Sequence, residues 1–176
     1  MTAVLAVQGD FREHENMLGS LGEPFFEIRN MDDAKRKFDR LVLPGGESTV
    51  QRKLLDELGI KEILRSKINS GIPVLATCAG LILLADFFKT LPVTVRRNAY
   101  GRQTGSFSTT DDFFGLGKIP MTFIRAPCIE SVRNDVDVKS ETDKRITGVQ
   151  FGKQIGIAFH PELDGDKALY KYFLSL

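Results

Sequence analysis

The chain has 176 residues, of which 27% are charged and 42% hydrophobic, and its formal net charge is +1. This length favours one domain with a single buried core, and we expect one domain over residues 1–176. The balanced charge argues against binding to nucleic acid or to an anionic membrane, and no apolar run approaches the roughly 20 residues of a membrane-spanning helix. We therefore expect a cytoplasmic protein whose partners are small molecules or other proteins.

Short apolar runs alternate with stretches of helical spacing in the first half of the chain. The runs are rich in leucine and β-branched residues without polar alternation, as is typical of parallel strands covered on both faces. They span residues 3–7, 24–28, 40–44 and 72–77. The third stretch between them repeats apolar residues at helical intervals from residue 54 to residue 68. This order predicts an α/β fold, a three-layer sandwich with a mainly parallel central sheet flanked by helices.

The pattern changes after residue 90. Strand-like segments follow one another, separated by glycine, asparagine and aspartate, with no helical stretch between them. Such spacing favours antiparallel pairing, so we expect a C-terminal antiparallel portion. A final helix is expected over residues 166–176.

Cys78 lies at the point where an apolar strand ends and a helix begins, in the stretch PVLATCAGLILLADFF. Chemistry in such sheets collects beyond the carboxyl ends of the strands. A tight turn here, flanked by the small residues Ala76 and Gly80, predicts a nucleophile elbow that presents the sulfur at a helix N-terminus, where a thiolate is stabilised. The alternative is that Cys78 is a buried apolar residue, as free cysteine often is.

His160 and Glu162 are candidates for the base that such a nucleophile needs. They lie in the segment AFHPEL at the end of an expected strand, and in extended chain both side chains would point to one face. A carboxylate beside an imidazole holds its tautomer and stabilises the imidazolium. The residues therefore suggest a Cys78–His160–Glu162 triad, whereas a surface turn is the other interpretation of this segment.

The segment LPGGEST follows the third expected strand. Acyl transfer through a thioester passes through tetrahedral oxyanions, which need backbone N–H donors, and paired glycines adopt the conformations that such a turn requires. We place the oxyanion hole at Gly46 and at Ala79, and we expect Ser48 or Thr49 to cap the helix that follows. The segment lacks the spacing and the lysine of a phosphate-binding loop.

Two other residues have less specific surroundings. His14, in FREHENML, is expected on a solvated helix face among charged residues. Cys128, in RAPCIE, is expected to be a packed thiol. No histidine or cysteine pair shows ligand spacing, so we expect no metal and no cofactor.

Five segments in this order resemble the class I glutamine amidotransferases: PGGEST, TCAG, VRRNAYGRQTGSF, FIRAP and FHPE. Within that class they are similar to the glutaminase subunits of pyridoxal 5′-phosphate synthase, over nearly the whole chain. The resemblance implies a flavodoxin-like fold and hydrolysis of L-glutamine to L-glutamate and ammonia. It also implies that Cys78 is the nucleophile, His160 the general base and Glu162 the residue that orients this base.

The resemblance further implies a set of residues around the glutamine and a protein partner. The residues are Gly46, Glu47, Ser48, Arg97, Ile124 and Arg125. The partner is a (β/α)8-barrel synthase subunit in a large hetero-oligomer, and the loop and helix QGDFREHENM would line the interface with it. Free ammonia is mostly protonated in neutral water, which favours direct delivery to such a partner.

Three alternative functions remain open from the sequence. A glutaminase subunit of another synthase, such as that of histidine biosynthesis, would share the triad but should lack FIRAP and RNAYGRQ. A peptidase-like or chaperone-like relative would need neither the HPE segment nor the GGES loop. A non-catalytic binding subunit is disfavoured because all three triad positions are filled.

Overall fold

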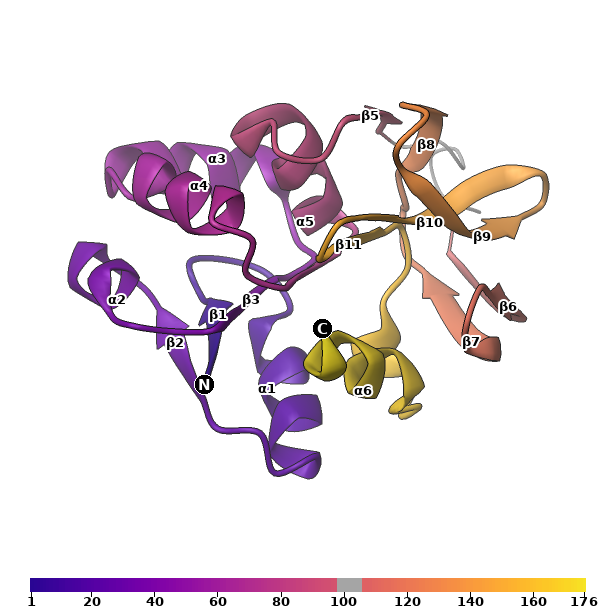
Figure 1. The fold of residues 1–176 in the computed structure, drawn as a ribbon, viewed down its shortest axis with the longest axis horizontal. Helices are drawn as coiled ribbons and strands as arrows, with labels where there is room; N and C mark the ends of the chain where they lie inside the picture. The colour runs from indigo at the N-terminus through magenta and orange to yellow at the C-terminus, as the bar shows by residue number, and fades with distance from the viewer. Residues whose placement is uncertain (98–105) are drawn as a thin grey trace.

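The structure, a computed structural model, describes residues 1–97 and 106–176. Its main sheet has the strand order β2-β1-β3-β4-β11-β10-β8-β5, and β9 pairs with β10 beside this path. The layers are clear in Figure 1, where α1 and α6 lie on one face of the sheet and α3, α4 and α5 on the other. Together these layers form the expected α/β sandwich.

The parallel half of the sheet contains the four strands expected from the apolar runs, with one strand added from the end of the chain. Their bounds are Thr2–Leu5 for β1, Phe25–Ile28 for β2, Arg40–Leu43 for β3, Val74–Thr77 for β4 and Gln154–Ile157 for β11. Strand β11 pairs parallel with β4, although it belongs to the C-terminal region where we expected antiparallel pairing. The carboxyl ends of β1, β3, β4 and β11 therefore meet at one edge of the sheet.

The C-terminal portion is antiparallel elsewhere, as expected. Strand β10 pairs antiparallel with β8, β9 and β11, while β6 and β7 form a separate hairpin. The bounds are Val93–Arg96 for β5, Phe107–Phe113 for β6, Gly117–Phe123 for β7, Cys128–Val132 for β8, Asp137–Thr142 for β9 and Arg145–Phe151 for β10.

Six α-helices, a π-helical turn and a 3-10 turn lie between or after the strands of the described chain. They are α1 Phe11–Ser20, α2 Met31–Lys35, α3 Ser48–Glu57, α4 Lys61–Asn69, α5 Ala79–Ile82, η1 Leu83–Phe88, η2 Pro161–Leu163 and α6 Ala168–Ser175. The final helix α6 confirms the expectation for residues 166–176. None of the helices in the described ranges is long and apolar enough to cross a membrane.

The stretch of helical spacing over residues 54–68 is helical, but it is divided between α3 and α4. Gly59 has a φ of 66°, a left-handed conformation that ends a helix. Leu55, on one side of the break, and Leu64, on the other, are both fully buried. The apolar spacing therefore marks residues that reach the same core from two helices.

Candidate active site

The turn after β4 holds Cys78 in a conformation that residues other than glycine rarely adopt. Its φ is 46° and its ψ is −101°, and α5 begins at the next residue, Ala79. Such strain costs about 1–3 kcal/mol and is typical of functional turns. This is the strand-turn-helix arrangement of a nucleophile elbow, as the sequence predicts.

Gly80 permits the close contact between this turn and the neighbouring strand β3. A Cβ atom at Gly80 would lie 2.0 Å from the carbonyl oxygen of Leu43. No side chain fits into that space, so Gly80 allows α5 to start directly against the sheet.

His160 follows β11, whose parallel partner β4 leads to Cys78. Its Nδ1 lies 2.7 Å from Oε1 of Glu162, and both side chains are buried. The sequence predicts this pair from an extended chain. In the structure Glu162 lies instead in the 3-10 turn η2. A 3-10 turn brings the carboxylate back toward the imidazole, so the contact is present for a different geometric reason.

The Cys78 sulfur and the Glu162 carboxylate act on the imidazole of His160. Burial disfavours its charged form, but the sulfur of Cys78 and the carboxylate of Glu162 outweigh burial and raise the pKa of His160 to about 10. Because Glu162 occupies Nδ1, Nε2 is the ring nitrogen left to face the sulfur, and it is buried with no hydrogen-bond partner within the described residues. His160 is therefore held as an imidazolium at neutral pH.

Burial would raise the pKa of Glu162, but nearby His14 and the hydrogen bond to His160 hold this pKa below its usual value. The carboxyl group is thus ionised near neutral pH. An ionised Glu162 can stabilise positive charge on His160.

The glycine loop after β3 lies against the same edge of the sheet. Gly46 has a φ of 144°, and a Cβ atom there would lie 2.6 Å from Oε1 of Gln8. The helix cap is Glu47, whose carboxylate accepts a hydrogen bond from the Thr49 backbone N–H, so the expectation of Ser48 or Thr49 as the cap is wrong. Ala79 is the first residue of α5, where a backbone N–H has no partner within the helix.

A cavity of about 490 Å³ opens over Cys78 and His160. All the residues expected around a glutamine border it, as does the second oxyanion candidate; these are Gly46, Glu47, Ser48, Ala79, Arg97, Ile124 and Arg125. Glu162 does not line the cavity because it lies behind His160. The structure thus brings the candidate residues together around one space, while their roles remain predictions.

The arginines that follow one another at the end of β5 have different surroundings. Arg97 lines the cavity and its Nη1 lies 3.4 Å from Oγ1 of Thr49. Arg96 instead pairs with Glu130 at 3.2 Å and contacts Cys128, which is buried, as expected. Residues 98–103 of the RNAYGRQ segment lie outside the described residues.

Gln8 and Asp10, in the loop after β1, also line the cavity, although the sequence indicates no individual role for either residue. Gln8 accepts a hydrogen bond from the Glu47 backbone N–H, and Oδ2 of Asp10 lies 3.5 Å from Nδ1 of His160. Burial raises the pKa of Asp10, against the opposing effect of His160. Asp10, His160 and Glu162 could together offer three ligand atoms to a metal ion, but His160 already shares Nδ1 with Glu162. The signal for these residues was the position of QGDF directly after a strand.

The expectation that His14 lies on a solvated face is wrong. Its side chain is fully buried, and Nδ1 lies 2.6 Å from the hydroxyl of Tyr170. His14 precedes Met17 and Leu18 by three and four residues, so it shares their buried face of α1. The charged neighbours in the sequence lie on the other faces of the helix.

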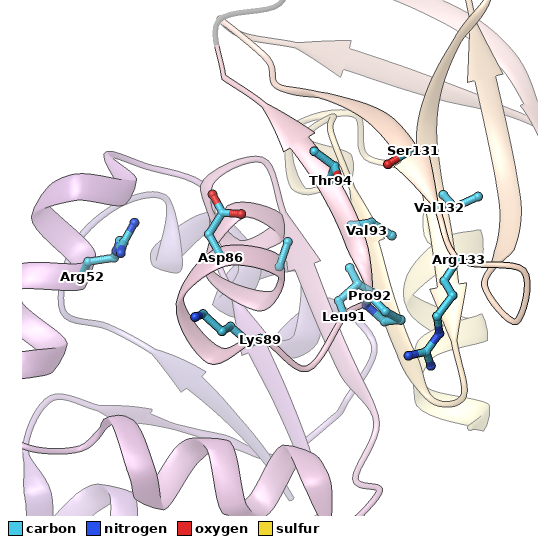
Figure 2. A pocket seen from close by; sticks show the side chains of 11 residues that line it. Arg52, Asp86, Lys89, Leu91, Pro92, Val93, Thr94, Ser131, Val132 and Arg133 are labelled. Carbon is cyan, nitrogen blue, oxygen red and sulfur yellow. The ribbon is translucent and has the colours of Figure 1, made fainter.

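A larger and more open hollow of about 790 Å³ lies between η1 and the β5–β8 pair (Figure 2). Arg52, Asp86, Lys89 and Arg133 reach it, together with apolar residues at and just before the start of β5. No cysteine or histidine is among the described residues that line it, so it lacks the nucleophile and base of the smaller cavity.

An elbow cysteine, a buried histidine–glutamate pair and a glycine loop at the edge of a mainly parallel sheet are the features of a class I glutamine amidotransferase. Solved structures agree with this class: a crystal structure of a glutamine amidotransferase has a TM-score of 0.91 and 37% identity, covering 99% of this chain and 97% of the other. The model of the SNO glutamine amidotransferase family matches residues 4–176. The chain belongs to this family.

Curated relatives are similar over almost their whole length. A pyridoxal 5′-phosphate synthase subunit PdxT from Desulfitobacterium hafniense is 56% identical, covering 98% of this chain and 90% of the relative. The protein of the same name from Methanocorpusculum labreanum is 51% identical, with coverages of 98% and 95%. A putative GMP synthase subunit from Thermoplasma acidophilum, at 18% identity and a TM-score of 0.74, shares the fold.

Proposed function

We propose that this chain is the glutaminase subunit of a pyridoxal 5′-phosphate synthase, and that one domain over residues 1–176 hydrolyses L-glutamine through Cys78, His160 and Glu162. The observation that carries the proposal is the pairing of an elbow cysteine with a buried histidine whose Nδ1 lies 2.7 Å from Glu162. The names of the curated relatives support the choice of synthase.

The first half of the reaction uses the thiolate and the imidazolium as a pair. The Cys78 sulfur attacks the side-chain amide carbon of glutamine, and the carbonyl oxygen becomes an oxyanion held by the N–H groups of Gly46 and Ala79. As the carbon–nitrogen bond breaks, Nε2 of His160 gives its proton to the nitrogen, which leaves as ammonia. A pKa of about 10 keeps this proton available at neutral pH.

The second half regenerates the enzyme. Neutral His160 takes a proton from water, and the oxygen of that water attacks the thioester carbon. The carbon–sulfur bond breaks, glutamate leaves, and Cys78 returns as the thiolate beside the restored imidazolium. Glu162 stays ionised throughout and stabilises the imidazolium in both halves.

The cavity supplies groups of both signs for a free amino acid. Glutamine carries an α-carboxylate, which the guanidinium of Arg97 can bind, and an α-ammonium group, which the carboxylate of Glu47 can bind. Ser48, Ile124 and Arg125 also line the cavity, and Arg125 has a φ of 44°. A site of this kind prefers free glutamine to glutamine within a peptide, which separates the proposal from a peptidase.

The partner we propose is a (β/α)8-barrel synthase subunit in a large hetero-oligomer in the cytoplasm. Ammonia must reach it before it takes up a proton, because ammonium is not a nucleophile. The loop 8–10 borders the cavity and leads into α1, so a partner docked on this loop would lie beside the site of ammonia release.

Isotope tracing tests the proposal. We expect [amide-15N]glutamine, given with the synthase subunit, its phosphosugar substrates and excess unlabelled ammonium, to place 15N in pyridoxal 5′-phosphate. The Cys78→Ala variant should leave the product unlabelled. If the 15N in the product were diluted to the level of the bulk ammonium, direct transfer would be contradicted. If N-acetylglutamine were hydrolysed as fast as free glutamine, a peptidase would be favoured.

A further inference from the structure

His14 connects the first helix to the candidate triad. Its Nδ1 faces the Tyr170 hydroxyl of α6 at 2.6 Å, and its Nε2 lies 3.2 Å from Oγ1 of Thr77 and 3.6 Å from Oε2 of Glu162. The ring is fully buried, and these three groups are its polar contacts within the described residues. None of them is part of the reaction described above except Glu162.

The contacts of His14 with Tyr170 and Glu162 favour one of the two positions of the ring proton. Tyr170 is buried, and no other hydrogen bond of its hydroxyl occurs in the described parts of the chain. Tyr170 can donate to Nδ1 when the ring proton is on Nε2, whereas the buried Thr77 hydroxyl could donate to Nε2 only in the other tautomer. The Glu162 carboxylate, 3.6 Å from Nε2, favours the proton on Nε2. The opposite tautomer would also direct a nitrogen lone pair at the Glu162 carboxylate.

The Nε2–H of His14 therefore points toward two oxygens. Oγ1 of Thr77 accepts the backbone N–H of Gly45 at 2.9 Å and, in this tautomer, the Nε2–H of His14 at 3.2 Å. Oε2 of Glu162 is fully buried and has no hydrogen-bond partner within residues 1–97 and 106–176. A distance of 3.6 Å is longer than a hydrogen bond, so the contact is an N–H dipole directed at a carboxylate.

We propose that His14 is a positioning residue, which stays neutral with its proton on Nε2 and holds Oε2 of Glu162 so that Oε1 remains on His160. A carboxylate held at only one oxygen can turn about its last bond, and the imidazole would turn with it. His14 removes this freedom from one side while His160 removes it from the other. The inference rests on the proposed function only for its kinetic consequence.

The tautomer can be measured without any activity. The chain has two histidines, so 15N-histidine NMR of the whole chain gives two ring systems, and the His160→Asn variant assigns them. We expect His14 as the neutral Nε2–H tautomer at pH 7. Burial lowers the pKa of His14, which agrees with a neutral ring. A charged His14, or a proton on Nδ1, would overturn the inference whether or not the protein hydrolyses glutamine.

Kinetics with the synthase subunit present separate positioning from packing. His14→Leu keeps an apolar side chain but no donor, whereas the amide of His14→Gln can present an N–H near the position of Nε2. We expect His14→Leu to lower kcat about tenfold, less than the roughly 10²-fold that a 1 Å misplacement can cost, with KM within about twofold. His14→Gln should recover most of kcat. Equal kcat losses in both variants, or no loss in His14→Leu, would overturn the inference.

A pair of tyrosines on α6 provides a matched control. Tyr170→Phe removes the donor to His14, and Tyr172→Phe removes a hydroxyl that lies 2.6 Å from Oε1 of Gln150, away from the triad. We expect Tyr170→Phe to populate both tautomers of His14 and to lower kcat, while Tyr172→Phe changes neither. A single unchanged tautomer in Tyr170→Phe would contradict the proposed role of the hydroxyl, and this variant remains informative if His14→Leu fails to fold.

Discussion

Gly45→Ala should damage the candidate active site by the addition of one methyl group. A Cβ atom at Gly45 would lie 2.5 Å from Cε1 of His160 and 2.9 Å from Oδ2 of Asp10. Asp10 is partly exposed and can turn away, but His160 is buried and held at Nδ1 by Glu162. The strain therefore falls on the imidazole.

The size of the effect follows from this distance. An ordinary contact of 3.4 Å requires the imidazole to move by about 0.9 Å relative to the new methyl group. A misplacement of about 1 Å in a catalytic group can cost about 10²-fold in rate. We expect kcat to fall by about this factor, with a smaller change in the KM for glutamine because Arg97 is not displaced.

Glutamate release in the presence of the synthase subunit measures this loss, and Gly19→Ala is the control. A Cβ atom at Gly19, within α1, would have a contact of 3.9 Å with Phe25, so this variant should keep its activity and gain about 0.5–1 kcal/mol of stability. A Gly45→Ala enzyme with normal kcat and a normal fold would refute the reasoning.

Three further predictions concern the thiols, the arginines and the buried histidine. Iodoacetamide should modify Cys78 at least about tenfold faster than Cys128, because Cys78 lines the cavity and Cys128 does not. Peptide mass spectrometry measures both rates, and glutamine should slow the modification of Cys78. Faster modification of Cys128 would contradict this prediction. Arg97→Ala should raise the KM for glutamine about tenfold or more and Arg97→Lys less, while an equal rise in Arg96→Ala would exclude a specific role. Burial lowers the pKa of His14 below 6.5, so the unfolded chain binds this proton first. Stability in thermal unfolding should then fall by up to about 1.4 kcal/mol per pH unit as pH drops below 6.5, and less steeply in His14→Gln; parallel curves would argue against it.

Local patterns in the sequence were sufficient for four of the parallel strands and for the elbow, but not for the parallel pairing of β11 with β4. Unbroken apolar runs predicted the parallel strands, and a cysteine between a strand and two small residues predicted the strained turn at Cys78. Both depend on neighbouring residues alone. The break at Gly59 was missed because apolar residues on either side of it face the same core.

Contacts between distant segments were harder to predict. His14 and Tyr170 are 156 residues apart, and nothing in the charged segment around His14 indicates a partner on the last helix. The periodicity with Met17 and Leu18 was the available signal for burial, but the charged neighbours outweighed it. The sequence predicted that Glu162 contacts His160, which the structure shows, but it did not predict the 3-10 turn that brings the two side chains together.

The most direct test of the central claim is glutamate release from L-glutamine by the wild-type chain and by Cys78→Ala, each with the synthase subunit at saturation. The account predicts steady release by the wild type and none above background by a folded Cys78→Ala protein. Equal release by the two proteins would show that Cys78 is not the nucleophile and would contradict the mechanism proposed for this site.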